Sequence, residues 1–261
     1  MASAPQDPAL PLFYKDLIPL NSQQHAGWKT RPTDKATWVA GINSVPLTVE
    51  EFPQAQRNFP IIFTAGESPI PLVLMGMNEG ANVFFDDEGT MTETVYVPAY
   101  VRRYPFMLAK LRPDSDELSL CVDPTSDLVG EMDEGERLFN DDGQPTEATT
   151  NMLQFCENFE IAGTKTAQFM AELQKHKLLM DGELNIDTGG GQPFTYRGFQ
   201  MVDENKLREV RGDVLRQWNQ SGLLPLIYAH LFSLELVRDI FNRQAVQGKV
   251  PNLPAPEAVN A

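Results

Sequence analysis

Apolar residues fall in short runs over the first half of the chain and at helical intervals over much of the second half. Before residue 123 the runs are separated by Pro, Gly, Asn and Asp, which is typical of antiparallel strands and turns. Between residues 146 and 180 apolar residues recur every three or four positions, which predicts an amphipathic helix. The pattern predicts an α+β fold, with an antiparallel β-rich N-terminal part packed on a C-terminal helical part that contains one β-hairpin.

Turn residues indicate where two hairpins lie. Residues 72–77 and 81–85 are apolar segments on either side of an Asn-Glu-Gly turn. An acidic turn at residues 86–89 follows, and it ends in a glycine that can adopt a positive φ. In the helical part, residues 183–187 and 194–202 flank three successive glycines, which predicts the second hairpin.

The last predicted helix covers residues 223–244 and is apolar on nearly every side as far as Val237. A helix with this pattern belongs inside a core. His230 lies in the middle of it, so we expect the imidazole to be buried and both ring nitrogens to have hydrogen-bond partners. A structural role is the first interpretation of His230, and a place in a ligand site is the second.

The segment TVYVPAYVRRYPFML, residues 94–108, combines aromatic residues, prolines and an arginine pair with apolar neighbours, and a proline interrupts the strand that it predicts. In an extended chain Arg102 and Arg103 point to opposite faces, so at least one guanidinium lies near apolar side chains. One interpretation is a structural salt bridge with stacking on Tyr100 or Tyr104. The other is an anion or ligand site at the junction of the two parts.

His25 and Trp28 are three residues apart in a polar, turn-rich segment. A hydrogen-bonded structural imidazole is the first interpretation of His25, and a ligand or proton-transfer role is the alternative. Trp28 is expected to be packed, with stacking on a ligand as the alternative. If distant parts of the chain converge on a ligand site, its candidate residues are His25, Trp28, Tyr100, Arg102, Arg103 and His230.

Composition and charge exclude several classes of protein. The 261 residues are 42% hydrophobic and 9% aromatic, which is enough to fill a core. A net charge of −15 argues against nucleic-acid binding and against attachment to an anionic membrane surface. The most apolar run, residues 223–234, is too short to be inserted in a membrane. The first residues lack the pattern of an export signal, so we expect a cytoplasmic protein.

No motif in the sequence dictates a reaction, a metal or a cofactor. Cys121 and Cys156 are the only cysteines and form no metal-binding pattern. Two free thiols in a reducing compartment are the first interpretation, and a disulfide in a secreted protein is the alternative. The acidic turn at 86–89 lacks the spacing of a calcium loop, and the glycines at 189–191 lack the residues of a phosphate-binding loop. We therefore predict no metal, no cofactor and no catalytic residues.

Three long segments resemble the SapC family, bacterial proteins named for a link to surface-layer protein genes. They are YVPAYVRRYPF, the upstream PIIFT…PLVLMGMNEGANVFFDDEG and the downstream FQMVDENKL…SGLLPLIYAHLFSL, and the resemblance extends over residues 14–243. It implies an accessory role in surface-layer or envelope systems and brings no catalytic residues to this chain. One hypothesis is therefore a non-catalytic accessory or binding protein, whose partner is an unknown protein or a small anionic ligand. The alternative is an enzyme or small-ligand protein that uses the arginine and histidine candidates.

The domain organisation follows from where the periodic patterns begin and end. Residues 1–11 and 246–261 are rich in proline and small or polar residues, and we expect disordered arms there. Residues 12–245 are predicted to form a single SapC-like domain, β-rich over 12–123 and mainly helical over 124–245.

Overall fold

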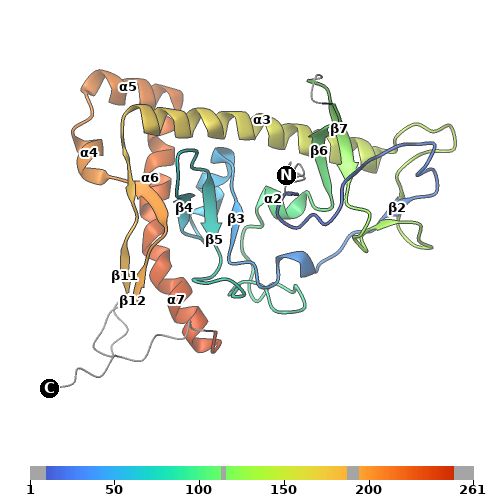
Figure 1. Ribbon diagram of the computed structural model, residues 1–261, viewed down its shortest axis with the longest axis horizontal. Coiled ribbons are helices and arrows are strands. Elements are labelled where there is room, and N and C mark those ends of the chain that lie inside the picture. The colour runs from blue at the N-terminus through green and yellow to red at the C-terminus, as the bar shows by residue number, and fades with distance from the viewer. Residues whose placement is uncertain (1–9, 113–115, 187–193, 250–261) are drawn as a thin grey trace, which may run out of the picture.

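The computed structural model describes residues 10–112, 116–186 and 194–249 (Figure 1). Its strands are β1 (Ile18–Pro19), β2 (Lys29–Thr30), β3 (Ser44–Pro46), β4 (Ile61–Thr64), β5 (Pro71–Leu74), β6 (Phe106–Lys110), β7 (Leu118–Val122), β8 (Val129–Gly130), β9 (Glu136–Arg137), β10 (Leu179–Asp181), β11 (Leu184–Ile186), β12 (Phe194–Tyr196) and β13 (Phe199–Val202). Its helices are α1 (Phe52–Ala55), α2 (Ala99–Arg102), α3 (Glu147–Lys175), α4 (Glu204–Arg208), α5 (Gly212–Ser221), α6 (Leu223–Ser233) and α7 (Val237–Val246), with short 3-10 turns η1 (Thr37–Val39), η2 (Val49–Glu51) and η3 (Leu234–Leu236).

The predicted α+β class is confirmed. The strand pairs within the described ranges are antiparallel, and the longer helices α3 and α5 to α7 all follow residue 146. Figure 1 shows α3 running along one side of the strands, while α6 and α7 lie at one end of the long axis. None of the helices within residues 10–112, 116–186 and 194–249 has the length and hydropathy that a membrane span requires.

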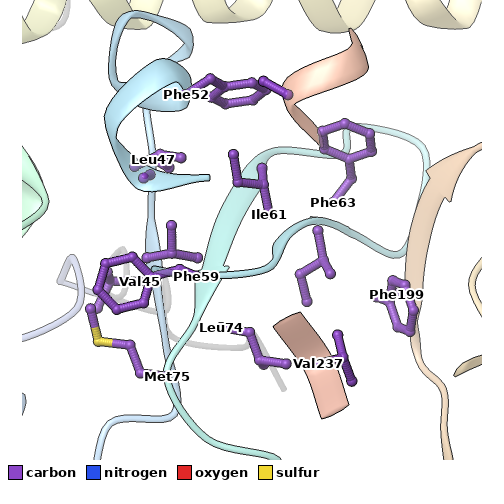
Figure 2. Close-up of a cluster of buried hydrophobic side chains, with 14 of the residues drawn as sticks. Val45, Leu47, Phe52, Phe59, Ile61, Phe63, Leu74, Met75, Phe199 and Val237 are labelled. Carbon is purple, nitrogen blue, oxygen red and sulfur yellow. The ribbon is translucent and has the colours of Figure 1, made fainter. Parts of the chain in front are cut away.

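The largest sheet joins the two halves of the sequence. Its strand order is β10-β13-β4-β5-β3, so β13 of the helical half lies beside β4 of the N-terminal half. The register places Val73 opposite both Ile61 and Val45, and all three side chains are fully buried. Helix α6 packs against β4 and β13. Figure 2 shows Val45 and Ile61 gathered with Val237 of α7 in the core that results.

The second predicted hairpin is present but shorter than expected. Strand β11 pairs with β12, and Leu184 lies opposite Tyr196. The segment that follows, β13, leaves the hairpin and pairs instead with β10 and β4. Gly198 has φ +92° between β12 and β13, and the buried side chains of Phe199 and Val202 hold β13 in the larger sheet. The three glycines predicted to form the turn lie outside the described residues.

The prediction of the first hairpin was wrong for its second strand, residues 81–85. Strand β5 pairs with β3 and β4, whereas residues 81–84 are not in a strand. The buried side chain of Asn82 explains the difference, because its oxygen accepts hydrogen bonds from the backbone N–H groups of Phe84 and Phe85. Its amide group donates to the carbonyl oxygens of Val39 and Ile42. Asn82 thus accepts hydrogen bonds from the backbone N–H groups that would otherwise have paired with a neighbouring strand.

The prediction of a strand around Pro98 was also wrong. Residues 99–102 form the short helix α2, and the strand begins only at Phe106, after a cis peptide bond between Tyr104 and Pro105. Pro98 precedes the helix with φ −55°, and the first helical N–H, that of Ala99, donates to a carboxylate oxygen of Glu51 at 2.6 Å. A carboxylate at a helix start favours the helix, since it accepts from a donor that has no partner within the helix.

Two clusters of buried apolar side chains lie along α3. The larger cluster combines residues 36–101 with residues 169–241, and the smaller one gathers side chains of β6, β7, β8 and the first half of α3. The side chain of Thr146 accepts a hydrogen bond from the N–H of Thr149 and caps α3 at its start. Helix α3 contributes to both clusters, so it connects them along its length. The single-domain organisation of residues 12–245 remains a prediction.

The last predicted helix is interrupted and has an exposed face. The 3-10 turn η3 separates α6 from α7. His230 is fully buried, as expected, but Phe232 is 69% exposed and Tyr228 is 42% exposed. Their rings stack on each other, with centroids 5.7 Å apart. The expectation that this helix lies inside a core was therefore wrong for one of its sides, since α6 packs on the sheet with one face and exposes Tyr228 and Phe232 on another.

Candidate functional site

A hollow of about 480 Å³ lies where the two apolar clusters meet. The loop between β2 and η1, helix α2, the start of β6 and the first turns of α3 surround it. Its apolar lining includes Trp38, Val97, Val101, Phe106 and Met152. We call this hollow the Arg102 pocket, because Arg102 also lines it. A volume of this size, with mostly apolar walls, is typical of sites for small organic molecules.

An aromatic pair forms part of the wall of the Arg102 pocket. The rings of Trp38 and Tyr104 are tilted by 33° with centroids 4.9 Å apart. The indole N–H of Trp38 is buried and has no hydrogen-bond acceptor among the described residues. The Tyr104 hydroxyl lies 3.5 Å from a carboxylate oxygen of Asp123, and burial raises the pKa of Tyr104 above its usual value. Flat, rigid side chains of this kind suit a ligand that contains a ring.

The cationic residues of the pocket differ in how they are paired. Arg31 forms an ion pair with Asp127 at 2.6 Å, and Lys35 forms one with Glu88 at 3.0 Å. Both ion pairs are exposed, so each contributes little to stability and water readily replaces the contact between its charged groups. Among the described residues, no carboxylate lies within ion-pair distance of the Arg102 guanidinium. Of Arg31, Lys35 and Arg102, only Arg102 has no acidic partner among the described residues that an anionic ligand would have to displace.

The guanidinium of Arg102 is held by neutral groups. Its Nε donates to the carbonyl oxygen of Val97 at 3.0 Å, and its Nη2 donates to the hydroxyl oxygen of Tyr96 at 3.3 Å. The guanidinium carbon lies 5.1 Å from the ring centroid of Phe155 and 5.8 Å from that of Tyr96. The side chain is thus oriented without a carboxylate contact, which leaves its charge available to an anion.

A second hollow of about 400 Å³ also borders Arg102. Its lining includes Glu51, Tyr96 and Phe155 and is more polar than that of the Arg102 pocket. Glu51 is only 6% exposed, and its carboxylate accepts four hydrogen bonds. The donors are the backbone N–H and hydroxyl of Thr48, the hydroxyl of Tyr96 and the N–H of Ala99. Four donors compensate the cost of burying this charge.

The structure separates the arginine pair into an exposed and a buried side chain. Arg103 is 5% exposed, and its guanidinium carbon lies 4.4 Å from the ring centroid of Tyr100 and 4.2 Å from that of Phe159. A carboxylate oxygen of Glu160 lies 3.6 Å from Nη1, while Nε has no partner among the described residues. Arg103 thus has the salt bridge that the structural interpretation describes, and it stacks on Tyr100. Neither residue lines the Arg102 pocket.

His25 and Trp28 form a separate local contact. Their ring centroids are 4.3 Å apart, and His25 Nδ1 accepts a hydrogen bond from the N–H of Asn21 at 3.0 Å. Burial lowers the pKa of His25, which favours the neutral imidazole that this bond requires. Trp28 packs against the smaller apolar cluster. These contacts are those of a structural imidazole and a packed tryptophan.

His230 is joined to backbone groups of the large sheet. Its Nε2 accepts from the N–H of Val202 at 3.1 Å, and its Nδ1 donates to the carbonyl oxygen of Ile61 at 2.8 Å. Its ring stacks on Phe63, with centroids 4.4 Å apart. Burial lowers the pKa of His230 to about 4. Figure 1 shows α6, which carries His230, and β2, which follows the His25 loop, at opposite ends of the molecule.

The six candidate residues therefore do not converge on one site, since His25 contacts Trp28, Arg103 contacts Tyr100 and His230 lies apart from both pairs. Of the six, only Arg102 lines the Arg102 pocket. Trp38, Tyr96 and Glu51 were not among the candidates predicted from the sequence. For Glu51 a signal existed, because Thr-x-x-Glu before a helical segment is the pattern of a capping box, and Thr48 and Glu51 form one. For Trp38 and Tyr96 no local signal marks a site, since their neighbours come from distant segments.

A polar cluster at the end of α3 was also missed. One carboxylate oxygen of Glu172 lies 3.1 Å from His176 Nε2 and 3.1 Å from the indole nitrogen of Trp218, and Lys175 contacts the carboxylate as well. These contacts, led by the Lys175 hydrogen bond, hold the pKa of Glu172 below its usual value. The spacing of Glu172 and His176, one helical turn apart, could have indicated this pair.

Cys121 and Cys156 are buried, and burial raises the pKa of Cys156 to about 12, so neither thiol is a ready nucleophile. Among the described residues, no group of three or more His, Cys, Asp or Glu side chains is placed to hold a metal ion. The Arg102 pocket combines apolar walls with an oriented cation, and this arrangement can recognise an anion that carries an apolar body.

Comparison with known proteins places the chain in a family. No match is found among the curated proteins or among the solved structures. The model of the family described as SapC matches residues 20–240, which is most of the chain. The matched range includes Trp38, Glu51, Tyr96 and Arg102, and so the principal polar and aromatic residues of the site. The chain therefore belongs to the SapC family.

Proposed function

We propose that this protein binds a small organic anion, with the apolar body of the ligand in the Arg102 pocket and its charged group at Arg102. The observation that carries the proposal is an oriented guanidinium without a carboxylate partner among the described residues, at the edge of an apolar hollow of about 480 Å³. Binding of this kind needs no nucleophile or metal. It fits the binding-protein hypothesis better than the enzyme hypothesis.

The walls of the pocket support a ligand with a flat apolar body. Trp38 and Tyr104 supply rings, and Val97, Val101 and Met152 supply aliphatic surface. Transfer of apolar area from water to such walls stabilises a complex by roughly 25 cal/mol per Å² before the entropy of association is subtracted. The body of the ligand would therefore contribute affinity, and the charge at Arg102 would contribute orientation and selectivity.

An accessory role is the second candidate, and the family resemblance suggests it. A link to surface-layer or envelope systems and a cytoplasmic location are part of this proposal. The observation that favours a protein partner is the exposed, stacked pair Tyr228 and Phe232 on α6, since exposed aromatic side chains are common at interfaces. A comparison of the proteins captured by the wild type and by Phe232→Ser tests this candidate.

A pair of matched dyes tests ligand binding. Anilinonaphthalene sulfonate carries an anionic group on an aromatic body, and N-phenylnaphthylamine has the same body without the charge. We expect Arg102→Gln to weaken binding of the sulfonate about tenfold, because a charge-assisted hydrogen bond is lost, and to leave binding of the neutral dye unchanged. Fluorescence titration of both dyes measures the two affinities.

Two control variants locate the effect. Ala148→Phe fills the pocket from α3 and should weaken binding of both dyes. Arg216→Gln makes the same change of charge on α5, outside the pocket, and should change neither affinity. Equal loss of sulfonate affinity in Arg102→Gln and Arg216→Gln would contradict the proposal, because it would reflect net charge alone.

A further inference from the structure

Glu51 is a buried carboxylate that connects two segments of the chain. Its Oε2 accepts from the N–H and the hydroxyl of Thr48 at 3.0 and 2.9 Å, within the capping box of η2. Its Oε1 accepts from the N–H of Ala99 at 2.6 Å and from the hydroxyl of Tyr96 at 2.9 Å. One oxygen therefore serves the local helix start, and the other reaches the segment that carries Arg102.

The oxygen Oε1 of Glu51 contacts two groups that determine where the Arg102 side chain lies. Through the N–H of Ala99 it holds the first residue of α2, whose last residue is Arg102. Through Tyr96 it holds the hydroxyl whose oxygen accepts from Arg102 Nη2 at 3.3 Å. Burial and the Glu51 carboxylate raise the pKa of Tyr96 to about 12, so the hydroxyl stays protonated and donates to Glu51. Arg102, Tyr96 and Glu51 thus form a directed chain of hydrogen bonds.

We propose that Glu51 is the positioning residue of the ligand site, and that it acts through Tyr96 to present one edge of the Arg102 guanidinium to a planar or tetrahedral acidic group. This inference rests on the proposed function. A guanidinium has five N–H donors. Nε is used by Val97 and one N–H of Nη2 by Tyr96, so both donors of Nη1 and one of Nη2 remain.

The free donors define the chemical class of the ligand. One N–H of Nη1 and one N–H of Nη2 lie on the edge between these two nitrogens, and this edge matches two oxygens of one carboxylate, sulfonate or phosphate group in a fork. A phenolate or a single alkoxide offers one oxygen and would not use both donors. The ligand class is therefore an organic acid whose acidic group has at least two equivalent oxygens. Without the Tyr96 contact, the guanidinium could rotate and this edge would no longer be fixed.

Tyr96→Phe separates the positioning role of Glu51 from its structural role. The variant removes only the hydroxyl and leaves the Glu51 bonds to Thr48 and Ala99 in place. We expect the affinity for anilinonaphthalene sulfonate to fall about three- to tenfold, the effect of one hydrogen bond, with no change for N-phenylnaphthylamine. Fluorescence titration with both dyes provides the measurement, and a thermal melt confirms that the variant is folded.

The outcomes distinguish this inference from the proposed function. If Arg102→Gln weakens sulfonate binding and Tyr96→Phe does not, the positioning role is refuted and the ligand site stands. If Tyr96→Phe weakens binding of both dyes alike, Tyr96 only maintains the pocket, and the inference is again refuted. If Arg102→Gln has no effect on either dye, the proposed function itself fails. Selective loss of the sulfonate in both variants supports the inference.

Discussion

The imidazole of His230 is held neutral by backbone groups. Nε2 accepts from the N–H of Val202, so it has no free electron pair for a proton unless that bond breaks. Nδ1 donates to the carbonyl oxygen of Ile61, and the residue is fully buried. Burial lowers the pKa to about 4 in the folded protein, against a usual value of 6.5. Protonation would thus act against the contact between α6 and the large sheet.

We expect this imidazole to make stability depend on pH. Because the folded pKa lies below the unfolded one, its contribution is complete above pH 6.5 and is lost as the pH falls toward 4. Between pH 7.5 and 5.5 the loss should be about 1 kcal/mol. His230→Gln does not titrate and should lack this part of the decrease. Urea unfolding of both proteins at the two pH values measures the difference, and parallel decreases would contradict the account.

The burial of His230 could be predicted from sequence, but its partners could not. The apolar pattern of residues 223–237 places the imidazole in a core, whereas Ile61 is 169 positions away along the chain. The same limit applies to Arg103, whose stacking on Phe159 depends on how α3 packs. Arg102 could be singled out from the sequence, because a cation in an apolar segment is detectable locally, and the structure places it in the pocket lining. Its role in binding a ligand stays a prediction. Its neighbour Tyr96 gained its role only through the fold.

The turn at residues 86–89 supports the loop that borders the Arg102 pocket. Asp86 accepts hydrogen bonds from the N–H groups of Glu88 and Thr90, which closes the turn. Gly89 has φ +75°, and its carbonyl oxygen accepts from the N–H of Ala36, a residue that lines the pocket. A Cβ on Gly89 would overlap the backbone of Ala36 and Thr37. Asp86 thus has a structural role in this turn.

Gly89→Ala should destabilise the protein by roughly 2 kcal/mol or more, because the left-handed backbone and the overlap both disfavour a side chain. Gly80→Ala is the matched control. Gly80 has φ +81°, but a Cβ there would meet no atom within 4 Å, so we expect a loss of only about 1 kcal/mol. Chemical denaturation of both variants gives the comparison. Equal losses would show that the contact with the pocket loop contributes nothing.

Elements with strong local signals were predictable, and those decided by distant groups were not. Helix α3 follows from its apolar periodicity and from Thr146 at its start. Helix α2 could not be inferred, because valines and tyrosines in residues 94–108 favour a strand, and the carboxylate that holds the helix start belongs to Glu51. Likewise, Asn82 replaces a predicted strand with side-chain hydrogen bonds.

At the scale of the molecule, the Arg102 pocket lies between the two apolar clusters. Trp38, Val97 and Val101 belong to or pack against the larger cluster, while Phe106 and Met152 belong to or pack against the smaller one. The sequence interpretation of a ligand site at the junction of the N-terminal and C-terminal parts stays a prediction, since the two clusters do not coincide with those parts. The boundary between the clusters could not be read from the sequence, since the larger cluster combines both halves of the chain.

At this scale, we propose that an organic anion binds with its body in the Arg102 pocket and its charge at Arg102. A crystal structure of the protein soaked with anilinonaphthalene sulfonate would show this binding mode. We expect the dye rings beside Trp38 and two sulfonate oxygens within hydrogen-bond distance of Arg102 Nη1 and Nη2. Dye bound only over Tyr228 and Phe232, with an empty pocket at concentrations that saturate binding in solution, would contradict it.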